Sequence, residues 1–276
     1  MFDLSIWPYG NDALACFSDV MSFLERKDDS RAFLSDSAAS YRDDRLEDWQ
    51  ERLEYSHFLA EEYGLRYETV SFLFFVNLLD EAWKKYRKEH LSDELFVSTF
   101  DDLRVKNDEC FQLYGVFGSF VSRWFPAFFT LERFGFGRLE AEIRPFKLDS
   151  PLAAGTQVIN IHIPSGRSLD EKACQESYEK AADFFSLRTF VCDSWLLNPA
   201  NDRLDENSRI RRFKSRYDVL TVFEDRENSD AWRIFGREDI SAPAGLSEDT
   251  GLKRLYKDLL LEGKTIDRGY GMFRLK

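Results

Sequence analysis

The stretch VINIHIPSGRSLDE, residues 158–171, decides the fold that we expect for this chain. Over residues 158–163 the side chains alternate between two faces. Three isoleucines share one face, and Asn160 and His162 share the other, which predicts a β-strand. The next four residues, Pro-Ser-Gly-Arg, predict a tight turn. Ser168 and Glu171 have the spacing of a capping box, so a helix is predicted to begin directly after Ser168. The stretch therefore predicts a strand that leads through a turn into a helix.

Strand and helix patterns continue on both sides of this stretch. Further strands are predicted over residues 139–143, 189–197, 219–224 and 232–235, and helices over residues 168–185, 206–216 and 252–261. The last two strands are expected to form a hairpin. The order β–β–α–β–α–β–β–α implies at least one parallel crossover and helices packed on a mixed sheet. The expected class is therefore α+β or α/β.

The part of the chain before this sheet has a helical pattern. Apolar residues at spacings of three and four predict one helix that starts at Leu46 and stops at Gly64, and another over residues 67–89. A third helix is predicted to follow Ser92, and a fourth to cover residues 111–131. We expect a helical domain over residues 1–131 and a sheet-containing domain over residues 132–276.

The charge of the chain is unevenly distributed. The formal net charge is −12, from 38 Lys and Arg against 50 Asp and Glu, and all of the excess acid falls within residues 1–110. Net negative charge argues against a general nucleic-acid binder, which needs a basic surface. A polyanionic ligand remains compatible with the neutral remainder. An acidic region beside a cleft would instead favour a cationic amine.

Cysteine and histidine patterns exclude several other classes. No two of the four cysteines have the spacing of a metal knuckle and the histidines are scattered, so no metal site is expected: Cys16, Cys110, Cys174, Cys192, His57, His90 and His162. The first ten residues lack the features of a signal peptide. The longest apolar stretch, residues 111–131, is interrupted by Arg123 and Pro126, which favours a buried helix over a membrane span. We expect a soluble, cytoplasmic protein with reduced thiols and no membrane partner.

The turn after residue 163 is the best candidate for a binding site. A strand, a turn of small residues and a helix start together direct backbone N–H groups and the positive end of a helix dipole to one place. Arg167 adds a full positive charge that suits a phosphate. The functional interpretation is a cradle for phosphate or pyrophosphate. The alternative is an ordinary capped turn, and neither the P-loop pattern nor the G-x-G-x-x-G pattern is present.

Four segments resemble a family of mostly bacterial acyltransferases. They are INIHIPSG (159–166), FVCDSWLLNP (190–199), FGRLE (136–140) and NSRIRRF (207–213). Members of this family join a helical N-acyltransferase domain to a C-terminal GNAT-like domain, that is, one like the GCN5-related N-acetyltransferases. The resemblance implies a protein that transfers an acetyl or other short acyl group from acetyl-CoA, or another acyl-CoA, to an amine of a small molecule or peptide.

The resemblance also implies where coenzyme A would bind. In this fold the pantetheine arm lies along the strand mapped here onto residues 158–163, which includes Ile161 and Ile163. The pyrophosphate lies on the turn that follows, formed here by Ser165, Gly166, Arg167 and Ser168. Arg212 is a candidate for the 3′-phosphate of coenzyme A, and the alternative is that its basic run is only a solvated helix face. The basic run consists of Arg209, Arg211, Arg212, Lys214 and Arg216. One departure is that the wider superfamily has a turn with more glycines, which allows closer approach of backbone to phosphate.

Three side chains are candidates for the chemistry. His162 is the candidate general base because an imidazole accepts a proton near neutral pH; the alternative is a histidine that only forms hydrogen bonds within the sheet. Ser194 or Tyr217 is the candidate proton donor to the departing thiolate. Cys192 as an acyl-carrying nucleophile is a weaker alternative to a buried, inert cysteine.

Two rival functions remain open from the sequence. The low glycine content of the turn favours a non-catalytic GNAT-like protein that binds a partner or metabolite. A different α/β enzyme that binds a nucleotide or another phosphate ligand is the second rival.

Overall fold

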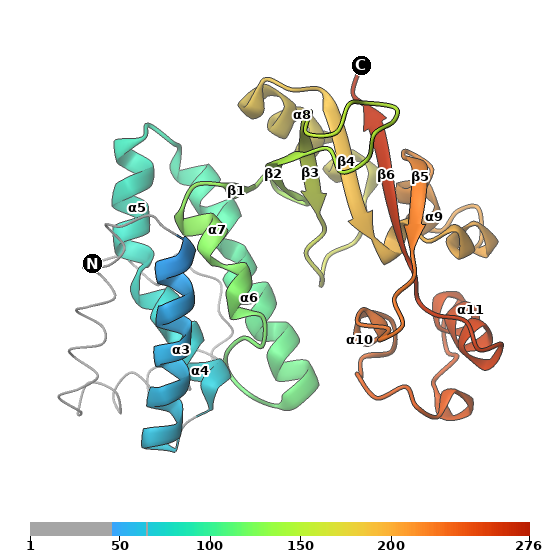
Figure 1. Cartoon of the computed structure of the whole chain (residues 1–276), viewed down its shortest axis with the longest axis horizontal. Helices are drawn as coiled ribbons and strands as arrows, with labels where there is room; N and C mark the ends of the chain where they lie inside the picture. The colour runs from blue at the N-terminus through green and yellow to red at the C-terminus, as the bar shows by residue number, and fades with distance from the viewer. Residues whose placement is uncertain (1–45, 65) are drawn as a thin grey trace. The chain divides into compact units, whose positions relative to one another are not determined.

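The computed structural model describes residues 46–64 and 66–276, and the chain divides into two compact units, Met1–Gly135 and Phe136–Lys276 (Figure 1). The boundary predicted after Leu131 lies close to this division. Residues 1–45, which contain Cys16 and the N-terminal stretch considered above, lie outside the described residues. Each unit is described by itself.

The first unit is helical. Its elements are α3 (Leu46–Tyr63), α4 (Tyr67–Asn77), α5 (Leu79–Lys88), α6 (Asp93–Tyr114), η2 (Ser122–Trp124), α7 (Pro126–Phe129) and the short strand β1 (Arg133–Gly135). Aromatic side chains from three helices fill its core. The ring of Phe75 lies 5.1 Å from that of Phe125 and 5.4 Å from that of Phe129, which also lies 4.9 Å from Phe100. Such contacts add to the free energy that burial of the rings supplies.

Two predicted helices of this unit are wrong in extent. The helix expected over residues 67–89 is broken at Leu78, where the amide of Leu78 donates to the carbonyl oxygen of Phe75 in a tight turn. The helix expected over residues 111–131 is interrupted. α6 ends at Tyr114, and its C-cap Gly115 adopts a left-handed conformation with φ 65°. Only η2 and the short α7 lie between there and residue 131. The start of α6 is confirmed, because Ser92 Oγ accepts from the amide of Leu95 at 3.1 Å.

Within the described part of the chain, no helix has the length and apolar content needed to span a membrane.

The second unit is built on a mixed sheet. Its strands are β2 (Glu140–Pro145), β3 (Gln157–His162), β4 (Thr189–Ser194), β5 (Asp218–Phe223) and β6 (Arg268–Arg274). The six-stranded order, which begins with β1, is β1-β2-β3-β4-β6-β5. β3 and β4 are parallel, and the β2–β3, β4–β6 and β5–β6 pairs are antiparallel. The parallel crossover predicted from the sequence is thus confirmed, with α8 (Glu171–Phe185) as its helix.

The remaining elements of the second unit are short. They are η3 (Trp195–Leu197), η4 (Pro199–Arg203), α9 (Arg209–Lys214), α10 (Ala231–Phe235), η5 (Pro243–Gly245) and α11 (Gly251–Leu261). The hairpin expected over residues 219–235 is wrong, because its second half is α10. The strand expected to continue to Leu197 stops at Ser194 and turns into η3. The strand β6, which lies between β4 and β5, was not predicted, since its two glycines, Gly269 and Gly271, interrupt the apolar pattern.

The sheet has two different faces. Tyr178 of α8 packs on Phe190 and Phe273, with ring centroids 5.3 and 4.9 Å apart, so α8 covers the face that also carries Cys192 and Ser194. We call this the α8 face. The opposite face, here the His162 face, contains a small core cluster of Phe146, Val158, Val191 and Tyr270. Because side chains alternate along a strand, His162 and Asp193 lie on this second face.

Candidate functional site

The candidate site lies where β3 and β4 separate. The parallel pairing ends at Ile161 opposite Cys192, although the two strands continue to His162 and Ser194. We call the segments beyond this pair, His162–Ile163 and Asp193–Ser194, the strand fork. A fork between parallel strands leaves backbone N–H and C=O groups that the sheet ladder does not use.

The turn that follows β3 is held by one arginine. Arg138 is buried, and its guanidinium donates to three backbone carbonyl oxygens: Nη1 to Pro164 at 2.9 Å, Nη2 to Arg167 at 3.0 Å and Nε to Ser168 at 2.8 Å. Burial lowers the pKa of this guanidinium from its ordinary value. Gly166 supplies the positive φ, 77°, that the turn requires.

The helix start differs from the prediction. The N-cap of α8 is Asp170, whose carboxylate accepts from the amide of Ala173 at 2.9 Å, so the capping box expected at Ser168 is wrong. The reason is that Ser168 is engaged elsewhere. Its hydroxyl accepts from Arg209 Nη1 at 2.5 Å, and its carbonyl accepts from Arg138. The turn therefore includes Leu169 as well as the predicted residues 165–168.

The basic helix α9 contacts this turn by the hydrogen bond from Arg209 to Ser168, and not by Arg212. Arg212 Nη2 donates to Asn207 Oδ1 at 2.8 Å, within its own segment. The other cations of the run have structural partners: Arg211 with the Leu204 carbonyl, Lys214 with Asp202, and Arg216 with Gln175 and the Tyr178 ring. Most of the run therefore secures the helix, and Arg209 joins it to the turn.

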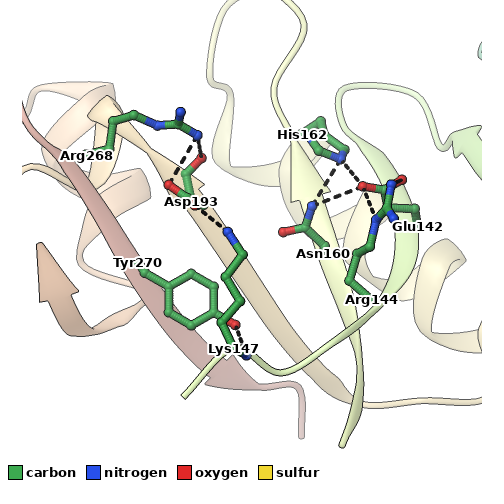
Figure 2. Close-up of polar contacts among 8 residues, drawn as sticks. All are labelled: Glu142, Arg144, Lys147, Asn160, His162, Asp193, Arg268 and Tyr270. Carbon is green, nitrogen blue, oxygen red and sulfur yellow. Dashed lines mark hydrogen bonds and ion pairs between the residues drawn. The ribbon is translucent and has the colours of Figure 1, made fainter. Parts of the chain in front are cut away.

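His162 is part of a polar cluster on its face of the sheet (Figure 2). Its Nε2 lies 2.7 Å from Glu142 Oε1 and 3.0 Å from Asn160 Nδ2. Glu142 is buried on β2 and is also bonded by Arg144, whose Nε lies 3.0 Å from Oε1. We assign a proton to Nε2, which donates to the carboxylate, so that Nδ1 is the basic nitrogen of the neutral ring. The amide nitrogen of Asn160 is also a donor, and it then bonds Glu142 Oε1 at 3.3 Å rather than the ring. A carboxylate that orients an imidazole and stabilises its protonated form is the arrangement of a general base.

A second polar cluster lies on the same face (Figure 2). Asp193 Oδ2 is 2.6 Å from Lys147 Nζ, and Asp193 Oδ1 is 3.2 Å from Arg268 Nη2. Lys147 also lies over the ring of Tyr270. Two cations on one carboxylate give this part of the face one excess positive charge.

The other predicted catalytic residues lie on the α8 side. Ser194 is half-buried at the strand fork, and its Oγ accepts from the amide of Leu196 at 3.1 Å, which leaves its own proton available. Tyr217 is buried, and its hydroxyl lies 2.8 Å from that of Tyr178. Burial raises the pKa of Tyr217 well above its ordinary value.

Cys192 has the surroundings of an inert cysteine. Its side chain is completely buried, and burial raises the pKa of its thiol. A thiol held in its neutral form is a poor nucleophile, so the geometry gives no support to an acyl-cysteine. Among the described residues, no group of three or more metal-ligating side chains was found.

Sequence reasoning did not single out two residues of this region, Arg138 and Glu142, and it included Arg209 only as one member of the basic run. Arg138 falls in the FGRLE segment that carried the family resemblance, so its presence there was a usable signal. Glu142 could have been paired with His162 only with the β2–β3 register, which places it opposite Asn160. The contact of Arg209 joins residues 41 apart in the sequence, and no local pattern indicates it.

The mixed sheet, the strand fork and the turn before α8 are parts of a GNAT-like domain. Residues 128–273, more than half of the chain, match the GNAT-like C-terminal domain, and residues 12–131 match the N-acyltransferase N-terminal domain. The chain therefore belongs to the family of proteins that carry these two domains. The predicted family is confirmed.

Solved structures with the same fold are acyltransferases. One, in complex with CoA and 10C-teicoplanin, has a TM-score of 0.70 at 20% identity and covers 98% of this chain and 89% of its own. Another, in complex with decanoyl-CoA and teicoplanin, has a TM-score of 0.69 at 21% identity and covers 78% and 69%. A mutant acyltransferase in complex with octanoyl-CoA has a TM-score of 0.69 at 20% identity and covers 98% and 89%. No curated protein sequence matches this chain.

Proposed function

We propose that this protein is an acyl-CoA-dependent N-acyltransferase. The observation that carries the proposal is the position of the His162–Glu142 pair at the strand fork, directly before a turn with a buried arginine beneath it. The His162–Glu142 pair suits deprotonation of an amine, and the turn with its buried arginine suits a polyanionic coenzyme. The complexes of the similar acyltransferases with coenzyme A and its acyl derivatives agree with this assignment.

The residues of the turn fit coenzyme A as the acyl donor. Arg138 is a buried cation under the turn, and Arg167 and Arg209 add positive charge to it. The amides of residues 165–168 are the proposed donors to the pyrophosphate, with the backbone of Ile161 and Ile163 along the pantetheine arm. Arg212 stays a candidate for the 3′-phosphate. Bound there, acyl-CoA supplies the thioester that the reaction consumes.

The proposed chemistry uses both faces of the sheet. His162 accepts a proton from the amine as its nitrogen forms a bond to the thioester carbonyl carbon. Backbone N–H groups at His162–Ile163 are the proposed donors to the oxyanion. The carbon–sulfur bond then breaks, and the thiolate takes a proton from the hydroxyl of Ser194 on the α8 face. Solvent then returns a proton to Ser194. Tyr217 is the alternative donor, but its hydroxyl is already engaged by Tyr178.

The proposal also specifies the length of the acyl chain and the class of acceptor. The similar acyltransferases were solved with octanoyl-CoA and decanoyl-CoA, which favours a chain longer than the acetyl or short acyl group expected from the sequence. One of the similar structures also holds teicoplanin, a glycopeptide, together with decanoyl-CoA. For this chain we propose an amine on a small molecule or peptide as acceptor, without a commitment to a glycopeptide.

A donor series tests the proposal. Purified protein is incubated with acetyl-, octanoyl- or decanoyl-CoA and an amine panel of amino sugars, aminoacyl peptides and polyamines. Release of free thiol and the mass of the N-acyl product are measured. We expect turnover with octanoyl- or decanoyl-CoA that depends on His162. Binding of acyl-CoA with no product from any amine would favour a non-catalytic protein, and binding of nucleotides alone would favour another phosphate-ligand enzyme.

A further inference from the structure

We propose that Arg138 is a positioning residue that shapes the turn of residues 164–168 for the pyrophosphate of coenzyme A and places a buried positive charge beneath it. This inference rests on the function proposed above, because it names how the same site holds its donor. It explains how a turn with a single glycine, Gly166, serves where a turn with more glycines was expected.

The geometry of the peptide bond links the arginine to the amides of the turn. In a trans peptide, the carbonyl of one residue and the N–H of the next point in opposite directions. The one cis bond among the described residues precedes Pro151, so the peptides of this turn are trans. Arg138 draws in the carbonyls of Pro164, Arg167 and Ser168. The amides of the residues that follow each of these, Ser165, Ser168 and Leu169, therefore point away from the guanidinium.

These hydrogen bonds direct the turn amides towards the ligand side, a result that extra glycines would achieve by conformational freedom. Without the guanidinium, three carbonyl dipoles would be free to turn towards the ligand side, where they would repel phosphate. With it, their oxygens are fixed on the inner side of the turn. Only one position then needs the left-handed conformation, and Gly166 occupies it with φ 77°.

The backbone of Arg138 is held by a side chain of α8. Ser177 Oγ, on the buried side of α8, accepts from the amides of Arg138 at 3.0 Å and Leu139 at 3.3 Å. Gly137, which precedes the arginine, has φ 97° and allows the chain to turn there. The backbone of residue 138 is thus tied to the helix that begins just after the turn, while its side chain holds the turn.

The charge of Arg138 also points to an anionic ligand. The residue is 7% exposed, and its guanidinium bonds only to neutral carbonyl oxygens. In the described part of the chain, no carboxylate lies within ion-pairing distance of it. Buried charges are normally paired, because an unpaired one is costly to remove from water. Glu140 acts on the guanidinium only from beyond ion-pairing distance. A pyrophosphate on the outer side of the turn would supply a counter-charge directly at the turn.

Two substitutions and two donors test the inference. Arg138→Gln removes the charge and most of the bonds, whereas Arg138→Lys keeps the charge but cannot bond three carbonyls at once. The control is Arg188→Gln, which removes an exposed arginine of the same unit that pairs with Asp183. Each variant is assayed with octanoyl-CoA and with octanoyl-pantetheine, which lacks the pyrophosphate. Amide hydrogen exchange of residues 165–169 is measured without ligand.

We expect Arg138→Gln to raise the KM for octanoyl-CoA about tenfold or more, with kcat and the KM for octanoyl-pantetheine changed less than about twofold. Arg138→Lys should give an intermediate KM, and both variants should exchange these amides faster than Arg188→Gln. Equal losses with both donors would indicate general damage and overturn the inference. So would an unchanged KM or unchanged exchange. If Arg138→Gln does not fold, Arg138→Lys alone decides by the same two readouts.

Failure of the proposed function looks different. A wild-type protein that binds neither donor would refute coenzyme binding, and with it the pyrophosphate role of Arg138. Wild-type protein that uses octanoyl-CoA while Arg138→Gln behaves like Arg188→Gln would refute the role of Arg138 alone.

Discussion

His162 Nε2 lies 2.7 Å from the carboxylate of Glu142 on the neighbouring strand, and Glu142 is buried. The antiparallel register places Glu142 opposite Asn160, two residues before His162 and on the same face of the sheet. A buried carboxylate at this distance fixes the orientation of the ring and lies where it can stabilise positive charge that develops on the ring during proton transfer. The pair is therefore the part of the sheet most suited to proton transfer.

Glu142→Gln should lower kcat with little change in the KM for acyl-CoA. The amide keeps the shape of the side chain but cannot stabilise an imidazolium, so we expect a loss of about tenfold to a hundredfold, within the range for general-base catalysis. His162→Ala should cost at least as much. Steady-state kinetics with octanoyl-CoA measure both. Asp183→Asn is the control, because it changes an exposed carboxylate of the same unit that pairs with Arg188. A Glu142→Gln variant as active as this control would remove Glu142 from the mechanism.

Ser194→Ala and Tyr217→Phe should separate the two candidate proton donors. Ser194 lies at the strand fork with a proton to give, whereas the Tyr217 hydroxyl is bonded to Tyr178 in the interior. We expect Ser194→Ala to lower kcat about tenfold and Tyr217→Phe to leave it within about twofold. A rapid-mixing assay of thiol release checks this. The reverse order of effects would assign the proton donor to Tyr217.

Alkaline pH should destabilise the protein through its buried tyrosines and cysteine. Burial raises the pKa of Tyr217 and Tyr178 above the ordinary 10.0 and that of Cys192 above the ordinary 9.0. The unfolded chain releases these protons from about pH 9 upwards while the folded chain keeps them. Their stabilising contribution is therefore complete below pH 9 and is lost as pH rises.

Tyr217→Phe should flatten this decline by up to about 1.4 kcal/mol per pH unit above pH 10, since one such group is removed. Urea unfolding between pH 8 and 11 measures the free energy of unfolding for both proteins. Below pH 9 the variant should be about 1 kcal/mol less stable, from the lost hydrogen bond to Tyr178. Parallel curves over the whole range would contradict the assignment.

Gly269→Ala should destabilise the second unit. A Cβ atom at Gly269 would lie 2.4 Å from the carbonyl oxygen of Leu197, where η3 packs on β6. Relief of this contact requires a backbone shift, for which we expect a loss of about 1–3 kcal/mol in the free energy of unfolding. Gly245→Ala is the control, because its Cβ would meet no atom within 4 Å. Equal thermal midpoints for the two variants would refute the tight packing.

Local sequence patterns predicted those helices and strands in which the spacing of apolar residues matches the residues that are buried in the structure. β3 and α8 are of this kind, because one strand face and one helix stripe are buried against each other. β6 is not: its glycines are needed where Leu197 and Tyr217 approach its backbone, and this tertiary demand removes the strand signal. The capping box failed for the same reason, since contacts from Arg138 and Arg209 engaged Ser168.

The candidate site was predictable only in part. His162 stood out because its neighbours on the strand are isoleucines. Its partner Glu142 is 20 residues away and is brought near by strand pairing, which a single sequence does not specify. The three bonds of Arg138 likewise span 26 to 30 residues. Tertiary contacts of this kind determine the site, whereas local patterns determine the elements that carry it.

The most direct test of the central claim is a calorimetric titration of the full chain with octanoyl-CoA, followed by addition of the amine panel. We predict saturable binding well below millimolar ligand and an N-acyl product whose rate falls in His162→Ala while binding of octanoyl-CoA is retained. The absence of binding at millimolar octanoyl-CoA would contradict the account, and so would an unchanged rate of product formation in His162→Ala.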